Sequence, residues 1–358
     1  MTGYDITSLD ILNVAPTLSS TTAVKIYVKR VLTFLAVTGI IGLAAGRIYE
    51  QQGLTRDKGR LPQVGRSVDI GGRKLNIFCS GVGAPSVIFE SAGGPGYFWS
   101  DIQPKIAKVT TSCWYDRAGE GWSDPGPFPR TSASIAADLH ELLHRVDISG
   151  PYVLVGWSFG GLNVRVYNGL YPTDVAGVVL VDSAHEEEPR RAPKFFLAPT
   201  VPKYFRYPLY LLLRAAAGSG VVRLLQPQAQ LLHNPTRKQM IRALRQQPKS
   251  VVTDITTGLV VPESYEQARA LTRTGDLPLI VLTAGEPQLW SDPEEARQAA
   301  AYQQVWIHEI QSQLTRLSTR GRQIVVENSD HGIPDNAPDT VISAIEDVVV
   351  AVRAGKVK

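Results

Sequence analysis

A serine flanked by glycines lies near the middle of the segment YVLVGWSFGGLNVRVY, residues 152–167. Apolar residues lead directly into the pentapeptide GWSFG, and a pattern typical of a helix follows. A Gly-x-Ser-x-Gly sequence between a strand and a helix is typical of a nucleophile elbow, a sharp turn that exposes the serine hydroxyl. The glycines leave room for that turn, and the helix N-terminus favours negative charge. The pattern therefore predicts that Ser158 is a nucleophile for acyl transfer.

A serine hydroxyl attacks efficiently when a base removes its proton and a carboxylate orients that base. His331 is the candidate base, because it lies between the last expected strand and the final expected helix, in VVENSDHGIPDNAP. Asp182 in the segment GVVLVDSA is the favoured carboxylate, since it ends a strand expected beside the serine strand. Glu286, in the loop TAGEPQLWSDPEE after the next strand, is the alternative acid.

Two backbone N–H donors are needed to hold the negative oxygen that forms during acyl transfer. Phe159 follows the nucleophile and is expected to supply one of them. Gly94 lies in ESAGGPGYFW, whose glycines allow the backbone to approach a ligand closely, and it is expected to supply the other. Trp157 and Pro95 flank these positions and are the candidate substrate contacts.

Short apolar segments alternate with amphipathic helical patterns from about residue 66 onward, and they predict the sheet that positions these residues. The eight strand candidates are SVDI, RKLNIFCS, PSVIFES, TSCWYDR, YVLVGWS, GVVLVDSA, PLIVLTAG and QIVVENS. Strands joined by helical crossovers predict an α/β fold, in which a mostly parallel sheet is flanked by helices. The first two candidates are separated by Gly71 and Gly72, so they are expected to form an antiparallel hairpin.

The alternation stops between the sixth and seventh strand candidates. Residues 186–276 carry helical patterns without a strong strand, and they are too many for a structureless loop. We therefore expect a helical lid over one end of the sheet. Its aromatic residues favour an apolar substrate, although most are expected to pack against the core.

The segment VLTFLAVTGIIGLAAG, residues 31–46, contains no charged residue. About 20 mostly apolar residues span a bilayer as a helix, and Lys29, Arg30 and Arg47 lie where their side chains reach its two surfaces. A single-pass membrane anchor is favoured over a cleaved signal peptide or a buried core helix. The expected organisation is a flexible tail (1–23), the anchor (24–49), a linker (50–65), the α/β core (66–185 and 277–358) and the lid (186–276).

The composition limits the classes of function. The 358 residues contain 44% hydrophobic residues, enough for a sizeable core, and the net charge of +4 is mild. Basic residues are not interleaved with aromatic residues in a way that indicates nucleic-acid binding. The sequence has no zinc-ligand spacing, phosphate-binding loop or dinucleotide fingerprint, so no metal and no cofactor are expected.

Several segments resemble the α/β-hydrolase superfamily, over residues 66–358. They are AGGPG, WYDRAGEGWSDPG, VGWSFGG, LVDSAH and the late His331, in the order that the superfamily has. AGGPG is similar to the HGGPG oxyanion loop of proline iminopeptidases, with Ala92 in place of the histidine. Gln288 stands where many members carry the acid, which is why Asp182 and Glu286 both remain candidates. The expected anchor together with the segment VDIGGRKLNIFCSG resembles bacterial membrane-attached hydrolases of unassigned substrate.

In the fold that this resemblance implies, Cys79 and Cys113 lie on neighbouring antiparallel strands. They are expected either to form a disulfide or to remain two buried thiols. A disulfide persists in an oxidising compartment, so its presence would place the catalytic domain in the periplasm or outside the cell.

Together these features predict a membrane-anchored serine hydrolase that cleaves an ester, similar to carboxylesterases and lipases. Its expected substrate is an apolar small-molecule ester or acyl compound. An aminopeptidase, a perhydrolase or an acyltransferase could use the same three residues. A non-catalytic binding protein that kept the fold is the remaining alternative. The oligomeric state is left open.

Overall fold

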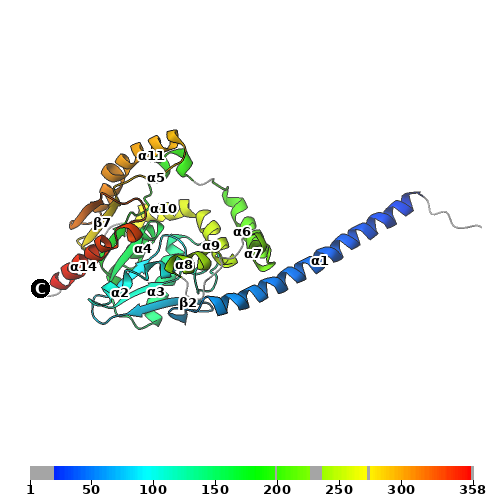
Figure 1. The fold of residues 1–358 in the computed structure, drawn as a ribbon, viewed down its shortest axis with the longest axis horizontal. Helices are drawn as coiled ribbons and strands as arrows, with labels where there is room; N and C mark the ends of the chain where they lie inside the picture. The colour runs from blue at the N-terminus through cyan, green and yellow to red at the C-terminus, as the bar shows by residue number, and fades with distance from the viewer. Residues whose placement is uncertain (1–19, 198–199, 226–235, 272–274, 356–358) are drawn as a thin grey trace, which may run out of the picture.

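A central sheet flanked by helices forms the body of the molecule, and one long helix projects from it (Figure 1). The computed structural model describes residues 20–197, 200–225, 236–271 and 275–355. The projecting helix is α1, and the C-terminal helix α14 lies at the opposite side of the body.

The sheet has eight strands in the order β1-β2-β4-β3-β5-β6-β7-β8. The strands are β1 (Arg66–Asp69), β2 (Lys74–Ser80), β3 (Val87–Glu90), β4 (Ser112–Tyr115), β5 (Tyr152–Trp157), β6 (Val175–Val181), β7 (Leu279–Ala284) and β8 (Gly321–Val326). Only β2 runs antiparallel to its neighbours, and the other neighbouring strands are parallel. The expected eight-stranded, mostly parallel sheet with an opening hairpin is confirmed.

Helices cover both faces of this sheet, and each face has its own hydrophobic core. The helices are α2 (Gln103–Ile106), α3 (Ser132–Arg145), α4 (Phe159–Leu170), α11 (Pro293–Val305), α12 (Ser312–Thr315), α13 (Ile333–Asn336) and α14 (Pro338–Gly355). Short 3₁₀ turns η1 (Gly96–Trp99) and η2 (Pro172–Asp174) and a π-helical segment η4 (Trp306–Gln311) accompany them. Side chains alternate along each strand, so in β5 Leu154 joins the core with α3 and α4, while Val153 and Val155 join the core with α14.

The described residues between β6 and β7, the region of the expected lid, form helices. They are α5 (Glu188–Arg191), η3 (Lys194–Phe196), α6 (Lys203–Gly218), α7 (Val221–Leu225), α8 (Arg237–Arg245), α9 (Pro248–Gly258) and α10 (Val261–Leu271). Residues 198–199, 226–235 and 272–274 of the expected lid lie outside the described part of the chain. Thr236 and Gln239 form a capping box at the start of α8, which explains where this helix begins.

The N-terminal helix α1 (Ser20–Arg60) is longer than the sequence predicts. Residues 1–19 of the expected tail lie outside the described residues, but residues 20–23 are helical, and so are residues 50–60 of the expected linker. The physical reason is a contact with α7: Glu50 and Asp57 of α1 both form ion pairs with buried Arg223, at 2.8 Å each. By its length and composition, α1 can cross a membrane, and its most apolar window is exposed.

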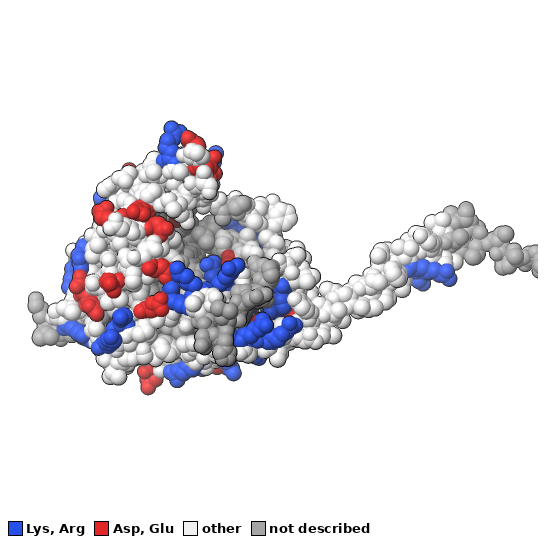
Figure 2. Space-filling view, viewed as in Figure 1, with Lys and Arg blue, Asp and Glu red and all other residues white. Residues whose placement is uncertain are grey.

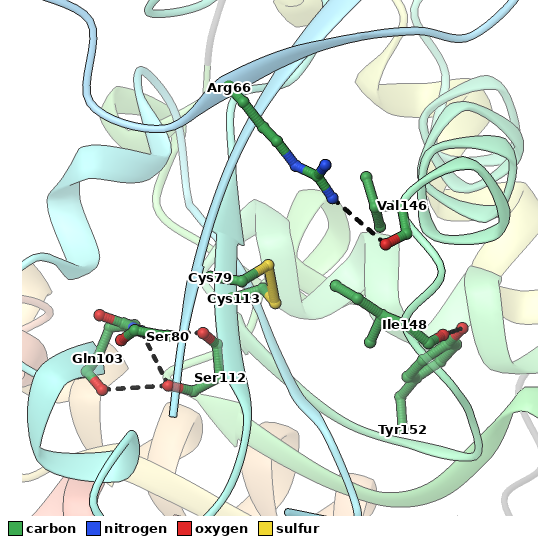
Figure 3. Close-up of a disulfide and its surroundings, with 9 residues drawn as sticks. All are labelled: Arg66, Cys79, Ser80, Gln103, Ser112, Cys113, Val146, Ile148 and Tyr152. Carbon is green, nitrogen blue, oxygen red and sulfur yellow. Dashed lines mark hydrogen bonds between the residues drawn. A yellow bond between two sulfur atoms is a disulfide. The ribbon is translucent and has the colours of Figure 1, made fainter. Parts of the chain in front are cut away.

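A disulfide joins Cys79 of β2 to Cys113 of β4, which face each other directly in the sheet (Figure 3). Next to it, Gln103 donates hydrogen bonds to Ser80 Oγ and to Ser112 O, at 2.8 and 2.9 Å. Of the two alternatives for the cysteines, the structure has the disulfide.

Candidate active site

Ser158 occupies a strained turn between β5 and α4. Its φ of 54° and ψ of −121° are unusual for a residue with a side chain, and such strain is found at functional sites. The neighbouring glycines make the turn possible, because a Cβ on Gly156 would lie 2.5 Å from Gly160 O. A Cβ on Gly160 would lie equally close to Glu90 O, at 2.5 Å, and one on Gly161 would lie 2.3 Å from Ser183 Oγ. The glycines of this segment are therefore required by close backbone and side-chain approaches.

His331 and Asp182 are hydrogen-bonded to each other, although they are distant in the sequence. His331 Nδ1 lies 2.7 Å from Asp182 Oδ2. Nδ1 must carry the proton, because a carboxylate oxygen accepts, and Nε2 is therefore the atom left to accept a proton in the neutral ring. The other oxygen of Asp182 accepts from Ala284 N at 3.0 Å and from Trp306 Nε1 at 2.7 Å. These donors fix the orientation of the buried carboxylate.

The pKa of His331 is raised above its ordinary value. Burial acts to lower this pKa, but the hydrogen bond and the charge of Asp182 outweigh it. The negative charges of Glu188 and Asp330 add to the same effect. The surroundings of His331 therefore favour a protonated imidazolium, the form that a general base reaches after it takes a proton.

The loop that carries His331 is held from two sides. Trp157 Nε1 donates to His331 O at 2.9 Å, and the Trp157 ring stacks on Phe98 with 4.4 Å between the ring centroids. Asp330 Oδ1 accepts from Gly332 N at 2.8 Å and from Asn336 Nδ2 at 2.7 Å. Trp157 was expected to contact substrate, whereas the contacts that the structure gives it position the His331 backbone.

Glu286, the alternative acid, lines the same cavity as His331, but its hydrogen bond goes to a different residue. Its backbone N donates to Ser329 O at 2.9 Å, and the residue is exposed. Gln288 lines the same cavity as Glu286 and has no carboxylate. Of the two acids predicted from the sequence, Asp182 is the one in hydrogen-bond contact with His331.

The glycine-rich loop after β3 is braced by two buried charged residues. Arg117 donates to Glu90 Oε1 at 3.1 Å, Ser91 O at 3.2 Å and Ala92 O at 3.3 Å. On the other side of the loop, an Asp116 oxygen accepts from Gly96 N at 2.7 Å. Since burial dominates its surroundings, the pKa of Asp116 is raised to about 6.

Within this loop, Gly94 has a φ of +74°, in the left-handed region that favours glycine. A Cβ on Gly94 would lie 2.9 Å from the aliphatic carbons of Arg245, so the lid helix α8 packs closely over the loop. Phe159 begins α4 directly after Ser158. Pro95 O accepts from Phe98 N at 3.2 Å, at the start of η1. These residues and Trp157 are not among those that line the cavity next to Ser158.

A cavity of about 160 Å³ brings the predicted catalytic residues together. Its lining consists of Ser158, Asp182, Ala184, Glu188, Phe196, Ala284, Glu286, Gln288, Tyr302, Gln303, Trp306 and His331. Tyr302, Gln303 and Trp306 come from the helices after β7 and were not predicted from the sequence. Their position after the seventh strand was the available signal, because parallel strands end at one edge of the sheet and the segments that follow them meet there.

Of the three consecutive lid glutamates, only Glu188 lines this cavity. Glu186 is paired with Arg165 at 2.9 Å, and Glu187 is paired with Arg269 at 3.2 Å. Glu188 accepts a hydrogen bond from Tyr265 OH at 3.2 Å. Burial raises the pKa of Glu188, so this carboxyl is held in an environment that disfavours its charge.

Comparisons with known proteins agree with this architecture. A model of the Alpha/beta hydrolase family matches residues 77–344. A thermophilic esterase from Thermogutta terrifontis and an alpha/beta hydrolase fold protein from Burkholderia ambifaria superpose with a TM-score of 0.54 each. Their sequences are 19% and 18% identical to this chain, and each comparison covers 80% of this chain and 98% of the solved one.

Among curated relatives, an uncharacterized protein of Schizosaccharomyces pombe is 36% identical over 100 residues, which is 28% of this chain. The chain matches only 18% of that relative's length. The likeness to the solved structures concerns the fold alone, whereas the family model covers most of the chain. Since the sheet order, the turn at Ser158 and the family match agree, the chain belongs to the α/β hydrolase family.

Proposed function

We propose that this protein is a serine hydrolase that cleaves an ester through an acyl-enzyme on Ser158. The observation that carries the proposal is the hydrogen bond of 2.7 Å between His331 Nδ1 and Asp182 Oδ2, on the wall of the cavity that Ser158 also lines. A nucleophile, a base and an orienting acid facing one cavity are the parts that acyl transfer needs.

In the proposed first step, Ser158 Oγ attacks the ester carbonyl carbon while His331 Nε2 takes the hydroxyl proton. Asp182 stabilises the resulting imidazolium. The N–H groups of Gly94 and Phe159 hold the negative oxygen of the tetrahedral intermediate. His331 then gives the proton to the departing alkoxide, which leaves as an alcohol, and the acyl group stays on Ser158. Water attacks this ester by the same steps in reverse, and releases a carboxylic acid.

The small cavity supports a compact acyl group as substrate. Its volume of about 160 Å³ is below that of ordinary drug-sized ligand sites. Phe196, Tyr302 and Trp306 give it aromatic walls, which favours an apolar group. The esterase with a similar fold supports an ester bond as the target. Transfer of the acyl group to peroxide or to another acceptor would use the same residues and remains an alternative.

A second candidate function rests on Glu188. Its buried carboxyl lies on the cavity wall, where it could pair with the amino group of a substrate. An aminopeptidase would use such a pair to hold the N-terminus of a peptide. The ratio of kcat/KM for aminoacyl p-nitroanilides to that for p-nitrophenyl esters, measured in the wild type and in Glu188→Gln, distinguishes the two functions.

We further propose that α1 anchors the protein in a membrane, with residues 24–49 as the span. The exposure and composition of this helix support the proposal. The disulfide between Cys79 and Cys113 supports an oxidising compartment for the catalytic domain, in the periplasm or outside the cell.

The proposed nucleophile is tested with a fluorophosphonate probe, which labels an activated serine covalently. We expect labelling of the wild type and of Ser67→Ala, an exposed serine control, and no labelling of Ser158→Ala. Labelling that persists in Ser158→Ala would refute the assignment. A panel of p-nitrophenyl esters of increasing acyl length then defines the acyl preference, and we expect kcat/KM to fall once the chain exceeds the cavity.

A further inference from the structure

The lid helices α6 and α7 expose an apolar surface on the outside of the body. Its side chains are between 45% and 75% exposed: Tyr204, Phe205, Tyr207, Leu211, Leu212, Val221, Leu224 and Leu225. We call these eight residues the lid apolar surface. A surface of this kind on a soluble domain marks an interaction site.

The inner side of the same helices is polar, which is the reverse of an ordinary helix packed on a protein. Arg206 of α6 is 8% exposed and pairs with Glu263 at 2.5 Å, and Arg223 of α7 is 4% exposed. Tyr210 faces inward as well, and its hydroxyl accepts from Arg214 at 2.8 Å. Leucines that face outward over buried arginines fit a hydrocarbon environment better than water.

The lid apolar surface is continuous with α1. Figure 1 shows α6 and α7 at the side of the body from which α1 projects. A Cβ on Gly46 of α1 would lie 2.1 Å from Ser219 O, in the turn between α6 and α7, so the two backbones touch there. Arg223 then fixes α7 to α1 through Glu50 and Asp57. The lid and the proposed anchor are thus joined directly.

The turn between α6 and α7 meets α1 at the end of its uncharged stretch. The uncharged stretch of α1 ends at Gly46, and Arg47 is the first charged residue after it. Because the turn between α6 and α7 meets α1 at Gly46, it lies where the hydrocarbon region of a bilayer would end. The exposed Lys203 at the start of α6 and the exposed Arg47 and Lys58 of α1 suit the headgroups of anionic lipids. In Figure 2, the part of α1 that projects beyond the body is mostly uncharged.

We propose that the lid apolar surface inserts into the bilayer that α1 spans, in the leaflet nearer the catalytic domain. The lid itself is then a membrane-binding element. This inference rests on the proposed anchoring by α1. The lid apolar surface would contact an anionic phospholipid bilayer, because this part of the protein is continuous with the spanning helix and is bordered by cations. A second copy of this chain or another protein would instead bury the surface away from lipid.

The test uses the full chain with one added cysteine that carries an environment-sensitive fluorophore. The sequence has only two cysteines, which form the disulfide, so the added thiol is free to react alone. The lid variants are Leu212→Cys and Leu225→Cys, and the matched control is Val82→Cys, which is 93% exposed between β2 and β3. Leu35→Cys in α1 reports on the anchor.

Each labelled protein is reconstituted into vesicles of phosphatidylcholine and phosphatidylglycerol, with or without lipids that carry a nitroxide on the acyl chain. We expect the nitroxide lipids to quench the probes at positions 212 and 225 several-fold more strongly than the probe at position 82. Quenching at position 35 without quenching at 212 and 225 would overturn the inference and leave the anchor in place. An absence of quenching at positions 35, 212 and 225 would overturn both the anchor and this inference. Aqueous iodide quenches probes that face water, so probes at 212 and 225 that neither iodide nor the nitroxide lipids quench would show that protein, such as a second copy of this chain, covers the surface.

Discussion

The turn at Ser158 and the pair of His331 and Asp182 face the same cavity, but the chain forms them in opposite ways. The turn is formed by residues 156–161, and a Cβ at its glycines would clash with Gly160 O, Glu90 O or Ser183 Oγ. The pair joins residues 149 positions apart and takes a further hydrogen bond from Trp306. The comparison teaches that a local glycine pattern marks the proposed nucleophile in the sequence, whereas the order of the strands determines which base and which acid meet.

The largest effect is expected at the nucleophile. Ser158→Ala removes the attacking oxygen, and we expect kcat for a p-nitrophenyl ester to fall by about 10⁶-fold. His331→Ala is expected to cost about as much, and the double variant little more, because the residues act as one unit. Steady-state kinetics with circular dichroism as a folding control measure this. A Ser158→Ala protein that retains most of its activity would show that the turn serves another purpose.

The same contrast explains what could be predicted from the sequence. The elbow, the hairpin at Gly71 and the eight strands follow from local patterns, and the fold they imply is the one observed. The sequence favoured Asp182 but left Glu286 as an alternative, because the choice depends on which side chain reaches His331 across the sheet edge. Trp306 was missed for the same reason, since its bond to Asp182 spans 124 positions.

The boundary of α1 illustrates the other limit of sequence reasoning. Residues 50–60 contain Gly53 and Gly59, which disfavour a helix interior. The helix continues because Arg223, which lies 173 positions after Glu50, pairs with two carboxylates on it. A tertiary contact thus overrides the local preference.

The second-largest effect tests the acid. Asp182→Asn leaves the shape of the side chain but presents an amide to His331 Nδ1, so the ring is held in the wrong tautomer. We expect kcat to fall by about 10⁴-fold. The matched variant is Glu286→Gln. Glu286 lines the same cavity, and its substitution is expected to keep kcat near that of the wild type. If Glu286→Gln is instead the variant that loses activity, Glu286 and not Asp182 is the orienting acid.

A smaller effect is expected at Trp306. Trp306→Phe keeps an aromatic ring but removes the donor that lies 2.7 Å from Asp182 Oδ1. Loss of a hydrogen bond to a charged group is expected to lower the free energy of unfolding by about 1.5–3 kcal/mol, with a reduction of kcat as the carboxylate loosens. Urea denaturation and steady-state kinetics measure the two effects.

Trp290→Phe is the control for this variant. Trp290 packs against Phe195 and Phe196, and its Nε1 has no hydrogen-bond partner among the described residues. Trp290→Phe loses ring packing but no hydrogen bond, so it is expected to lower the free energy of unfolding less than Trp306→Phe does. Equal losses in both variants would indicate that ring packing, and not the bond to Asp182, explains the result.

The smallest effect is a change in pH dependence at Glu188. A general base works in its neutral form, so kcat/KM is expected to rise with pH through the pKa of His331, at a midpoint above the ordinary histidine value. Glu188→Gln removes a negative charge that raises this pKa, so the midpoint is expected to move to lower pH. Glu187→Gln, at a carboxylate paired with Arg269, is expected to leave it unchanged.

The raised pKa of His331 also makes the stability of the fold depend on pH. Because the pKa of folded His331 is raised above its unfolded value, its interaction with Asp182 stabilises the fold most below the unfolded pKa. This contribution is lost as pH rises through the folded pKa. Asp182→Asn is therefore expected to lower the free energy of unfolding more at acidic than at alkaline pH, which urea denaturation across pH measures. A loss that is independent of pH would show that the carboxylate stabilises the fold through Ala284 and Trp306 and not through the charge of His331.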